Sequence, residues 1–247
     1  MRALITGASS GIGRDMAREL SNRGYELILV ARNEEKLEDL KKELQTKVEI
    51  ICMDLSVLEN CKELYETVKD IDILVNNAGF GVFGKFINTD IDKEINLIHT
   101  NIIAVHTLTK LFLKDMVKRN SGHILNVASI GGCMPGPLMA AYYASKAYIL
   151  RLSEGINEEL RKDKSKVQIS VLCPGPVKTN FNNVAGVKFN VHSLDSEYVA
   201  KYAIDKMLKG KLIIIPGILM KTVRFLTKIV PDNIVSKFVY YMQEKKR

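Results

Sequence analysis

The stretch Thr6-Gly7-Ala8-Ser9-Ser10-Gly11-Ile12-Gly13 stands between a short apolar run, residues 3–6, and an amphipathic segment that begins at once. Glycine has no Cβ, so a glycine-rich turn can bend tightly and let a ligand approach the backbone. The N-terminus of the helix that follows offers free N–H groups and a positive dipole to a pyrophosphate. Between a first strand and a first helix, this turn therefore predicts a dinucleotide-binding site.

Outward from this turn, short apolar runs alternate with amphipathic segments of helical period along most of the chain. The expected strands cover residues 3–6, 26–31, 48–53, 71–76, 123–128, 167–173 and 212–216. The expected helices lie near residues 13–23, 34–45, 58–69, 91–120, 140–162 and 197–209. Continuously apolar strands are typical of a parallel sheet that is covered on both faces. The alternation predicts an α/β fold, a Rossmann-like doubly wound parallel sheet of about seven strands in a single domain.

The composition is that of an ordinary globular protein, with 247 residues of which 47% are hydrophobic and 26% charged. No stretch approaches the roughly 20 apolar residues that span a bilayer, and Met1-Arg2 leads into the first strand without a signal peptide. We therefore expect a cytoplasmic protein. Cys52, Cys61, Cys133 and Cys173 lie far apart and are expected to be reduced and structural. The four histidines form no cluster, so no metal site is expected.

The net charge of +8 is concentrated at the C-terminal end. Residues 211–247 hold eight basic and two acidic residues, hence +6, which leaves +2 for residues 1–210. We expect a cofactor-binding and catalytic domain over residues 1–217, followed by a basic amphipathic extension over residues 218–247. In that extension Lys221, Arg224 and Lys228 share one helical face, which suits peripheral contact with an anionic membrane surface. The alternative is packing over the substrate cleft or at a subunit interface. No groove motif indicates a nucleic acid partner.

Further motifs follow the glycine-rich turn in a fixed order. They are Asn76-Asn77-Ala78-Gly79, Asn101, Ser129, Tyr142-x-x-x-Lys146 and Pro174-Gly175-Pro176-Val177-Lys178-Thr179. Together with the T-G-x-x-x-G-x-G spacing, these motifs resemble the short-chain dehydrogenase/reductase superfamily over roughly residues 1–216. The resemblance implies an oxidoreductase that interconverts a carbonyl and an alcohol with a nicotinamide cofactor. It also implies a homodimer or homotetramer built on the helices near residues 91–120 and 140–162.

The expected cofactor is NADP(H) rather than NAD(H). NAD enzymes of this fold place a carboxylate on the ribose 2′-OH about 20 residues after the turn. Ala31 stands at that position here, and the guanidinium of Arg32 beside it suits a 2′-phosphate, although it could instead be simply solvated. Many NADP-binding relatives carry a second basic residue in the turn, where this chain has Ser10. The expected cofactor-binding residues are Gly7, Ser9, Ser10, Gly11, Ile12, Gly13, Arg32, Asp54, Leu55, Asn77, Ala78, Gly79, Tyr142, Lys146, Pro174, Gly175, Val177 and Thr179.

The expected catalytic residues are Asn101, Ser129, Tyr142 and Lys146. A free tyrosine has a pKa near 10, which must shift for the phenol to act as acid and base near neutrality. Tyr142 and Lys146 lie four residues apart, on one helix face, and an ammonium group there is expected to lower the pKa of Tyr142. The resemblance implies that Ser129 binds the substrate oxygen and that Asn101 anchors a water in a proton relay. Tyr143, only three residues from Lys146, is expected to pack.

The substrate pocket is expected between residues 131–139 and residues 180–192. Neither segment places an obvious charge inside, which favours an apolar carbonyl substrate. His192 is expected in a surface loop, and His99 and His106 are expected to pack or to lie at an interface. A rival hypothesis is a non-catalytic NADP(H)-binding sensor or membrane-surface protein on the same fold. Relatives of that kind typically lose the tyrosine or the lysine, and here both are present.

Overall fold

A seven-stranded parallel sheet forms the centre of the molecule, in the computed structural model that describes residues 1–181 and 193–245. The strand order is β3-β2-β1-β4-β5-β6-β9. The strands are β1 (Arg2–Thr6), β2 (Glu26–Ala31), β3 (Val48–Cys52), β4 (Ile73–Asn76), β5 (His123–Val127), β6 (Gln168–Leu172) and β9 (Ile213–Ile214). The order reverses between β1 and β4, and ligands of open α/β sheets bind at such a switch point. The predicted doubly wound fold is confirmed.

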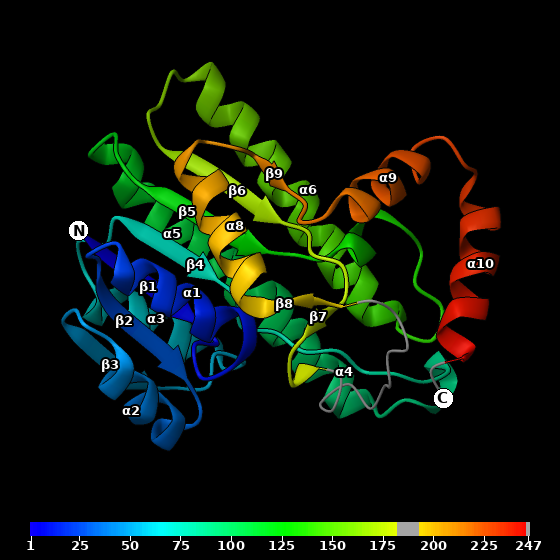
Figure 1. Cartoon of the computed structure of the whole chain (residues 1–247), viewed down its shortest axis with the longest axis horizontal. Helices are drawn as coiled ribbons and strands as arrows, with labels where there is room; N and C mark the ends of the chain where they lie inside the picture. Colours follow the sequence, from blue (N-terminus) through cyan, green and yellow to red (C-terminus); the bar gives the residue numbers. More distant parts are fainter. Residues whose placement is uncertain (182–192, 246–247) are drawn as a thin grey trace.

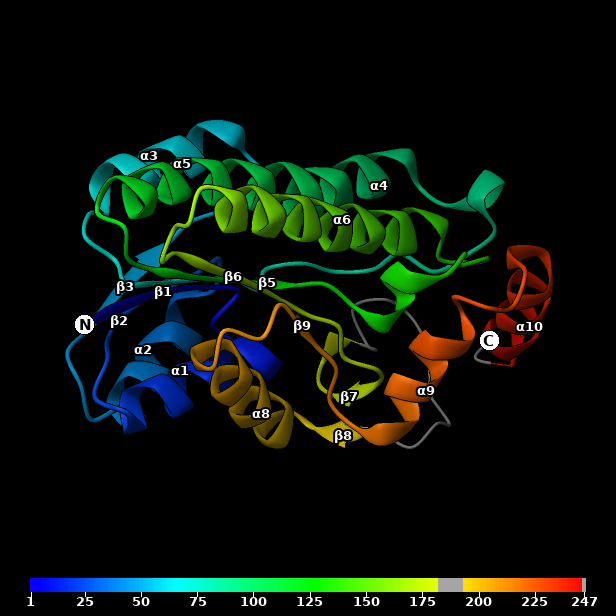
Figure 2. The ribbon, with the colours of Figure 1, turned by 90° about the horizontal axis from the view of Figure 1, so that it is seen from above.

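Helices cover both faces of the sheet (Figure 2). One face carries α1 (Gly11–Asn22), α2 (Glu34–Glu43) and α8 (Ser196–Leu208). The other carries α3 (Leu58–Thr67), α4 (Ile91–Ile98), α5 (Val105–Lys118) and α6 (Ala140–Lys162). Successive strand residues point to opposite faces, so Ile5 joins the core under α1 and α8, whereas Leu4 joins the core under α3 and α5. The central strands therefore need apolar residues on both of their faces.

The helix expected over residues 91–120 contains one wider turn. Between α4 and α5, residues His99–Ala104 adopt π-helical geometry, which is rare and is frequent at functional sites. Asn101 lies in this turn and is fully buried. A short parallel pair, β7 (Val177–Lys178) and β8 (Leu194–Asp195), was also not predicted, because two residues are too few to show a periodicity.

The C-terminal extension forms two helices, α9 (Ile218–Leu226) and α10 (Asp232–Glu244). Both lie at the end of the molecule away from α2 and β3 (Figures 1 and 2). Met220 of α9 packs on a core cluster that includes Cys173 and Ile215, and α10 buries Val235, Val239 and Gln243. Among the helices described, none is both long and apolar enough to cross a membrane.

Gly13 lies at the tightest contact between α1 and the sheet. A Cβ on this residue would lie 2.3 Å from Asn77 Nδ2 and 2.5 Å from the carbonyl oxygen of Gly7. Neither neighbour can move easily, because Asn77 Nδ2 donates hydrogen bonds to the backbone oxygens of Thr6 and Gly7. The turn therefore needs glycine at position 13 for packing, in addition to any need of a ligand.

We predict that Gly13→Ala lowers the free energy of unfolding by about 1–3 kcal/mol, as overpacking does in other cores. Gly155 provides the matched control, since it lies inside α6 with open space where a Cβ would stand. Gly155→Ala should raise stability by up to about 1 kcal/mol through helix propensity. Denaturant unfolding measures both, and equal effects of the two substitutions would contradict the packing argument.

Candidate active site

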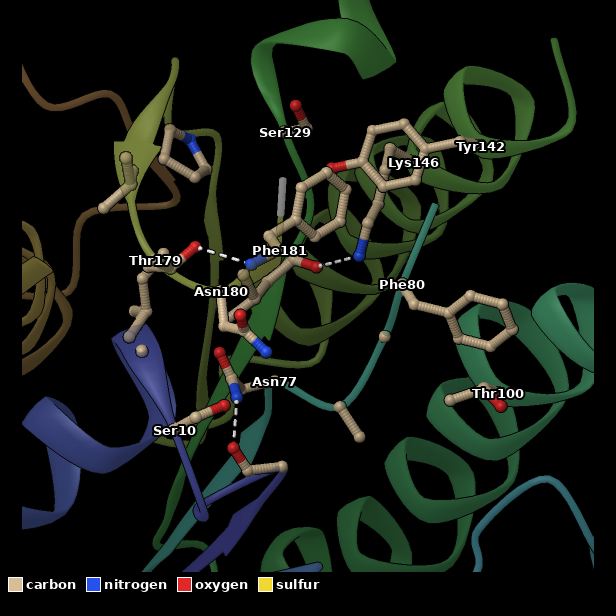
Figure 3. A pocket seen from close by; sticks show the side chains of 18 of the residues that line it. Ser10, Asn77, Phe80, Thr100, Ser129, Tyr142, Lys146, Thr179, Asn180 and Phe181 are labelled. Atoms are coloured by element: carbon tan, nitrogen blue, oxygen red, sulfur yellow. Dashed lines mark hydrogen bonds between the residues drawn. The ribbon is translucent and has the colours of Figure 1, made fainter. Parts of the chain in front are cut away.

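A cavity of about 640 Å³ lies at the carboxyl ends of the central strands. Its walls include residues that stand one or two positions after the end of a strand: Gly7 after β1, Arg32 after β2, Asp54 after β3, Asn77 after β4, Ser129 after β5 and Pro174 after β6. Of the residues expected to bind a cofactor, all except Gly13 line this cavity. Figure 3 shows Tyr142, Lys146, Ser129 and Thr179 around it, with Ser10 and Asn77 at the turn.

The glycine-rich turn approaches its neighbours too closely for side chains at two positions. Gly7 has φ +64°, and a Cβ there would lie 2.8 Å from Ala78 Cα. Gly11 has φ +55°, and a Cβ there would lie 3.0 Å from Thr179 Cγ2. Both conformations favour glycine. Both glycines also line the cavity at the N-terminus of α1, where helix N–H groups favour a pyrophosphate.

Hydrogen bonds join the turn to the end of β4. Asn77 Nδ2 donates to the backbone oxygens of Thr6 at 3.0 Å and Gly7 at 3.1 Å. In return, Thr6 Oγ1 accepts from the backbone N–H groups of Asn77 at 2.9 Å and Ala78 at 3.1 Å. The side chain of Asn77 thus binds the backbone of the turn and stabilises its conformation.

Arg32 and Asp54 form the rim of the cavity beside β2 and β3. The Arg32 side chain is 68% exposed, and its Nη1 lies 3.7 Å from Asp54 Oδ2. Burial raises the pKa of Asp54, but hydrogen bonds from Ser56 and the charge of Arg32 outweigh it, so the net pKa is lowered. The guanidinium is accessible to an anion in the cavity, and a carboxylate lies next to it.

Lys146 is only 5% exposed, and its Nζ donates to the carbonyl oxygen of Val127 at 2.9 Å. This orientation leaves Nζ 5.8 Å from the centre of the Tyr142 ring. Burial lowers the pKa of Lys146 to about 8. The lysine therefore loses its proton far more readily than an exposed one.

The expectation that Lys146 lowers the pKa of Tyr142 is wrong for these side chains. Burial raises the pKa of Tyr142 above its ordinary value, while a hydrogen bond with Ser129 lowers it by a smaller amount. The four-residue spacing does place both side chains on one face of α6, as expected. The ammonium group, however, turns toward Val127, so desolvation dominates the pKa of the phenol.

Asn101 lies behind the cavity wall rather than on it. Its Oδ1 accepts from the N–H of Phe80 at 3.1 Å, and its Nδ2 donates to the Phe80 carbonyl at 3.0 Å and to Ser145 Oγ at 3.1 Å. A Cβ on Gly79 would lie 2.9 Å from Asn101 Oδ1 and 3.3 Å from Lys146 Nζ. Asn101 and Lys146 are therefore neighbours across Gly79.

Ser129 stands at the start of a short 3-10 helix, Ile130–Cys133, where its Oγ accepts from the N–H of Gly131 at 3.1 Å. The Ser129 hydroxyl also acts on Tyr142, whose pKa it lowers. The fold thus gathers the four residues expected to be catalytic, with Ser129, Tyr142 and Lys146 on the cavity wall and Asn101 directly behind it.

An apolar cluster surrounds Tyr142 at one end of the cavity, and Phe83 is a member of it that the sequence did not single out. Phe181 lies against Tyr142 with ring centres 5.2 Å apart, and Met139 and Phe83 belong to the same cluster (Figure 3). The wall includes four residues of the two predicted substrate segments, namely Gly131, Met139, Asn180 and Phe181. Residues 182–192, with His192, lie outside the described residues.

Tyr143 packs as predicted, because a Cβ on Gly136 would lie only 2.0 Å from its ring. In addition, its hydroxyl accepts a hydrogen bond from Gln243 Nε2 at 2.8 Å, and both residues line the cavity. Gln243 belongs to α10 and is 1% exposed. A contact across a hundred residues has no local signal, so the sequence could not indicate it.

The remaining candidate ligands take no part in this site. Nδ1 of His99 lies 3.1 Å from the Ser56 carbonyl oxygen in a partly buried contact, whereas Nδ1 of His106 lies 2.7 Å from the Tyr148 hydroxyl on the surface. The four cysteines are free, as expected. Over residues 1–181 and 193–245, no cluster of three or more histidine, cysteine or acidic side chains could hold a metal ion.

Comparison with known proteins agrees with this geometry. The family model for short chain dehydrogenases matches residues 1–188. An uncharacterised oxidoreductase of Staphylococcus epidermidis is 34% identical over 181 residues, which cover 72% of this chain and 78% of that protein. The very-long-chain 3-oxoacyl-CoA reductase-B of Danio rerio is 35% identical, and the match covers 74% of this chain and 61% of that protein. A short-chain dehydrogenase from Sphingobium yanoikuyae, solved in complex with NADPH, has a TM-score of 0.82 at 28% identity, covering 93% of this chain and 96% of its own.

We predict that the buried charge of Lys146 makes stability rise with pH. Below pH 8 the folded and unfolded chains both carry the proton, so the cost of burying the ammonium is fully present. Between pH 8 and the ordinary lysine pKa of 10.5, the folded chain releases the proton first, which stabilises it. Relative to Lys146→Met, the free energy of unfolding of the wild type should rise by at most about 3 kcal/mol over this interval. Urea unfolding at each pH measures the free energy of unfolding, and Lys162→Met, at an exposed lysine, is the control. The prediction would be contradicted if this free energy changed with pH in the same way for the wild type and Lys146→Met.

Proposed function

We propose that this chain, which belongs to the short-chain dehydrogenase/reductase superfamily, interconverts a ketone or aldehyde and an alcohol with NADP(H). The family model that matches residues 1–188 is that of short chain dehydrogenases, which are oxidoreductases. The observation that carries the proposal is one continuous cavity: Tyr142, Lys146 and Ser129 line one part of it, and the glycine-rich turn and Arg32 line another. Phosphate-binding and proton-transferring groups therefore face the same space.

The residues on the wall fit a nicotinamide dinucleotide. The open backbone at Gly7 and Gly11 would hold the pyrophosphate, with Ser9, Ser10, Ile12 and Gly13 completing the turn. Arg32 would pair with a 2′-phosphate, and Asp54 and Leu55 would lie beside the adenine. The residues proposed along the nicotinamide half are Asn77, Ala78, Gly79, Pro174, Gly175, Val177 and Thr179. When bound, NADP(H) supplies or accepts the hydride.

Tyr142 is proposed to give its phenolic proton to the carbonyl oxygen during reduction and to take it back during oxidation. At neutral pH the phenol is protonated, so it carries the proton that reduction needs. Burial raises its pKa, which makes it a weaker acid than a free phenol. Ser129 would donate a hydrogen bond to the same oxygen and hold it beside Tyr142. Lys146, with its pKa near 8 and with Asn101 next to it, would return a proton to Tyr142 from solvent.

The proposed substrate is an apolar carbonyl compound. Met139, Phe83 and Phe181 form the apolar surroundings of Tyr142, with Tyr143 beside them. The 3-oxoacyl-CoA reductase of Danio rerio supports an acyl chain as one form of such a substrate. We also propose a homodimer or homotetramer, for which the exposed Ile91 and Ile95 of α4 offer apolar contact, and a cytoplasmic location, which suits four free cysteines.

We predict that Tyr142→Phe abolishes NADPH oxidation with every carbonyl in a panel of aldehydes, diketones, keto-acyl esters and ketosteroids. The affinity for NADPH, measured by fluorescence titration, should stay within about threefold, since a phenyl ring keeps the packing with Phe181. Loss of one proton donor normally removes at least about a hundredfold of the rate.

Tyr148→Phe is the matched control, because Tyr148 lies on the same helix and its hydroxyl bonds His106 on the surface. It should retain turnover. Full activity of Tyr142→Phe would contradict the proposed acid. Tight NADPH binding by the wild type without turnover of any carbonyl would favour the non-catalytic sensor instead.

We predict that Arg32→Asp reverses the cofactor preference. A charge-assisted hydrogen bond contributes about 1.5–3 kcal/mol, so the affinity for NADPH should fall at least about tenfold while that for NADH is kept or rises. Lys36→Asp makes the same change of charge on the exposed side of α2 and should leave the NADPH/NADH ratio unchanged. Comparable affinities of the wild type for NADH and NADPH would contradict the NADP(H) assignment.

A further inference from the structure

The two C-terminal helices expose large apolar side chains. Six of them form what we call the C-terminal apolar face. They are Ile218, Phe225 and Ile229 on and just after α9, exposed by 81%, 62% and 63%, and Ile234, Phe238 and Tyr241 on α10, exposed by 56%, 65% and 55%. An exposed apolar group of this kind marks a surface that binds something.

The spacing shows that this face is not the side on which the helices pack. On α10, Ile234, Phe238 and Tyr241 recur at intervals of four and three, so they share one stripe. Val235, Val239 and Gln243 recur at intervals of four and form a separate, buried stripe. The helix is therefore held to the body by one side while the apolar side remains uncovered.

The same is true of α9. Met220 packs on the core cluster of Cys173 and Ile215, and Arg224 lies 3.5 Å from Glu154, so these two side chains face the body. Ile218, Phe225 and Ile229 recur at intervals of seven and four on another side. Both helices consequently bind the body and present apolar side chains to a partner.

Exposed lysines flank the apolar face. Lys221 and Lys228 accompany the α9 stripe, and Lys237 and Lys245 accompany the α10 stripe. Over residues 218–245 the acidic side chains are only Asp232 and Glu244. A second copy of the chain is a poor partner, because a two-fold contact would bring together two faces that both carry positive charge. An anionic lipid surface offers both an apolar interior and negative charge.

The inner side of α10 reaches the cavity. Gln243 lines it and donates to the Tyr143 hydroxyl, next to Tyr142 in the chain. A helix with its side chains is about 10 Å across, so the apolar face lies roughly one helix diameter from the cavity wall. Phe86 and Ile87, exposed by 66% and 88%, add further apolar surface to the molecule.

We propose that α9 and α10 dock on an anionic phospholipid bilayer through the C-terminal apolar face and its four lysines. We further infer that the cavity takes a carbonyl compound with a long apolar chain from that bilayer. The docking stands on the exposed residues alone, whereas the substrate class rests on the proposed oxidoreductase function. The two parts are therefore tested separately.

The docking is tested by co-sedimentation of the full chain with vesicles of phosphatidylcholine, with and without phosphatidylglycerol. The wild type should bind the anionic vesicles at least about tenfold more tightly than the neutral ones, since each lysine near such a surface contributes about 1 kcal/mol. Phe225→Ser with Phe238→Ser should lower binding at least about tenfold. Tyr198→Ser, a comparably exposed aromatic residue on α8, is the matched control and should bind as the wild type does.

A second variant keeps the test independent of folding. Lys221→Glu, Lys228→Glu and Lys237→Glu together change only exposed side chains and should abolish binding to the anionic vesicles. Lys36→Glu, Lys62→Glu and Lys162→Glu make the same change of net charge elsewhere and should leave most of the binding. Equal loss in the two triple variants would overturn the docking face, as would a wild type that stays in solution. Dissociation of an oligomer by Phe225→Ser with Phe238→Ser, with no change in vesicle binding, would assign the face to a second copy and also overturn the proposal.

The substrate class is tested by turnover. With NADPH, the wild type should reduce a long-chain ketone presented in anionic vesicles at least about tenfold faster than the lysine triple variant does, while both reduce a short water-soluble ketone equally. Equal rates on the vesicle-bound ketone would overturn delivery from the bilayer. Vesicle binding without reduction of either ketone would leave the docking intact and contradict the oxidoreductase function.

Discussion

The hydrogen bonds that join the glycine-rich turn to the end of β4 are the constraint on which the site depends. Asn77 and Thr6 exchange side-chain and backbone hydrogen bonds across the switch point of the sheet, and Gly7 and Gly13 leave room for that contact. Strand order then brings the ends of β1 to β6 to one edge. Residues separated by more than a hundred positions meet there because the sheet is parallel and the order reverses beside β1.

Within that frame, burial governs the chemistry of the charged groups. Lys146 is held by the Val127 carbonyl in a nearly water-free position, and desolvation shifts the pKa values of Lys146 and Tyr142 in opposite directions, each toward the neutral form. The two pKa values thereby move apart, because a free lysine and a free phenol titrate at nearly the same pH. The π-helical turn at Asn101 adds a second polar group behind the same wall.

Much of this arrangement could be predicted from local sequence. Strand periods and the order of strand-end motifs identified the sheet, the turn and the positions of Arg32, Ser129 and Tyr142, because each depends on a few neighbouring residues. The direction in which the Lys146 ammonium points depends on Val127, which belongs to another strand, so spacing within α6 could not indicate it. The contact of Gln243 with Tyr143 depends on how α10 packs, and the stripe of exposed apolar residues on α10 is recognised only once the buried stripe is known.

The most direct test follows the hydride itself. The protein would be incubated with NADPH that carries deuterium at the transferable position of the nicotinamide, together with a long-chain ketone, and the product would be examined by mass spectrometry. We expect an alcohol with one deuterium on the former carbonyl carbon, and oxidised cofactor in equal amount. A protein that binds the deuterated NADPH tightly, yet transfers no deuterium to any carbonyl compound offered, would contradict the account.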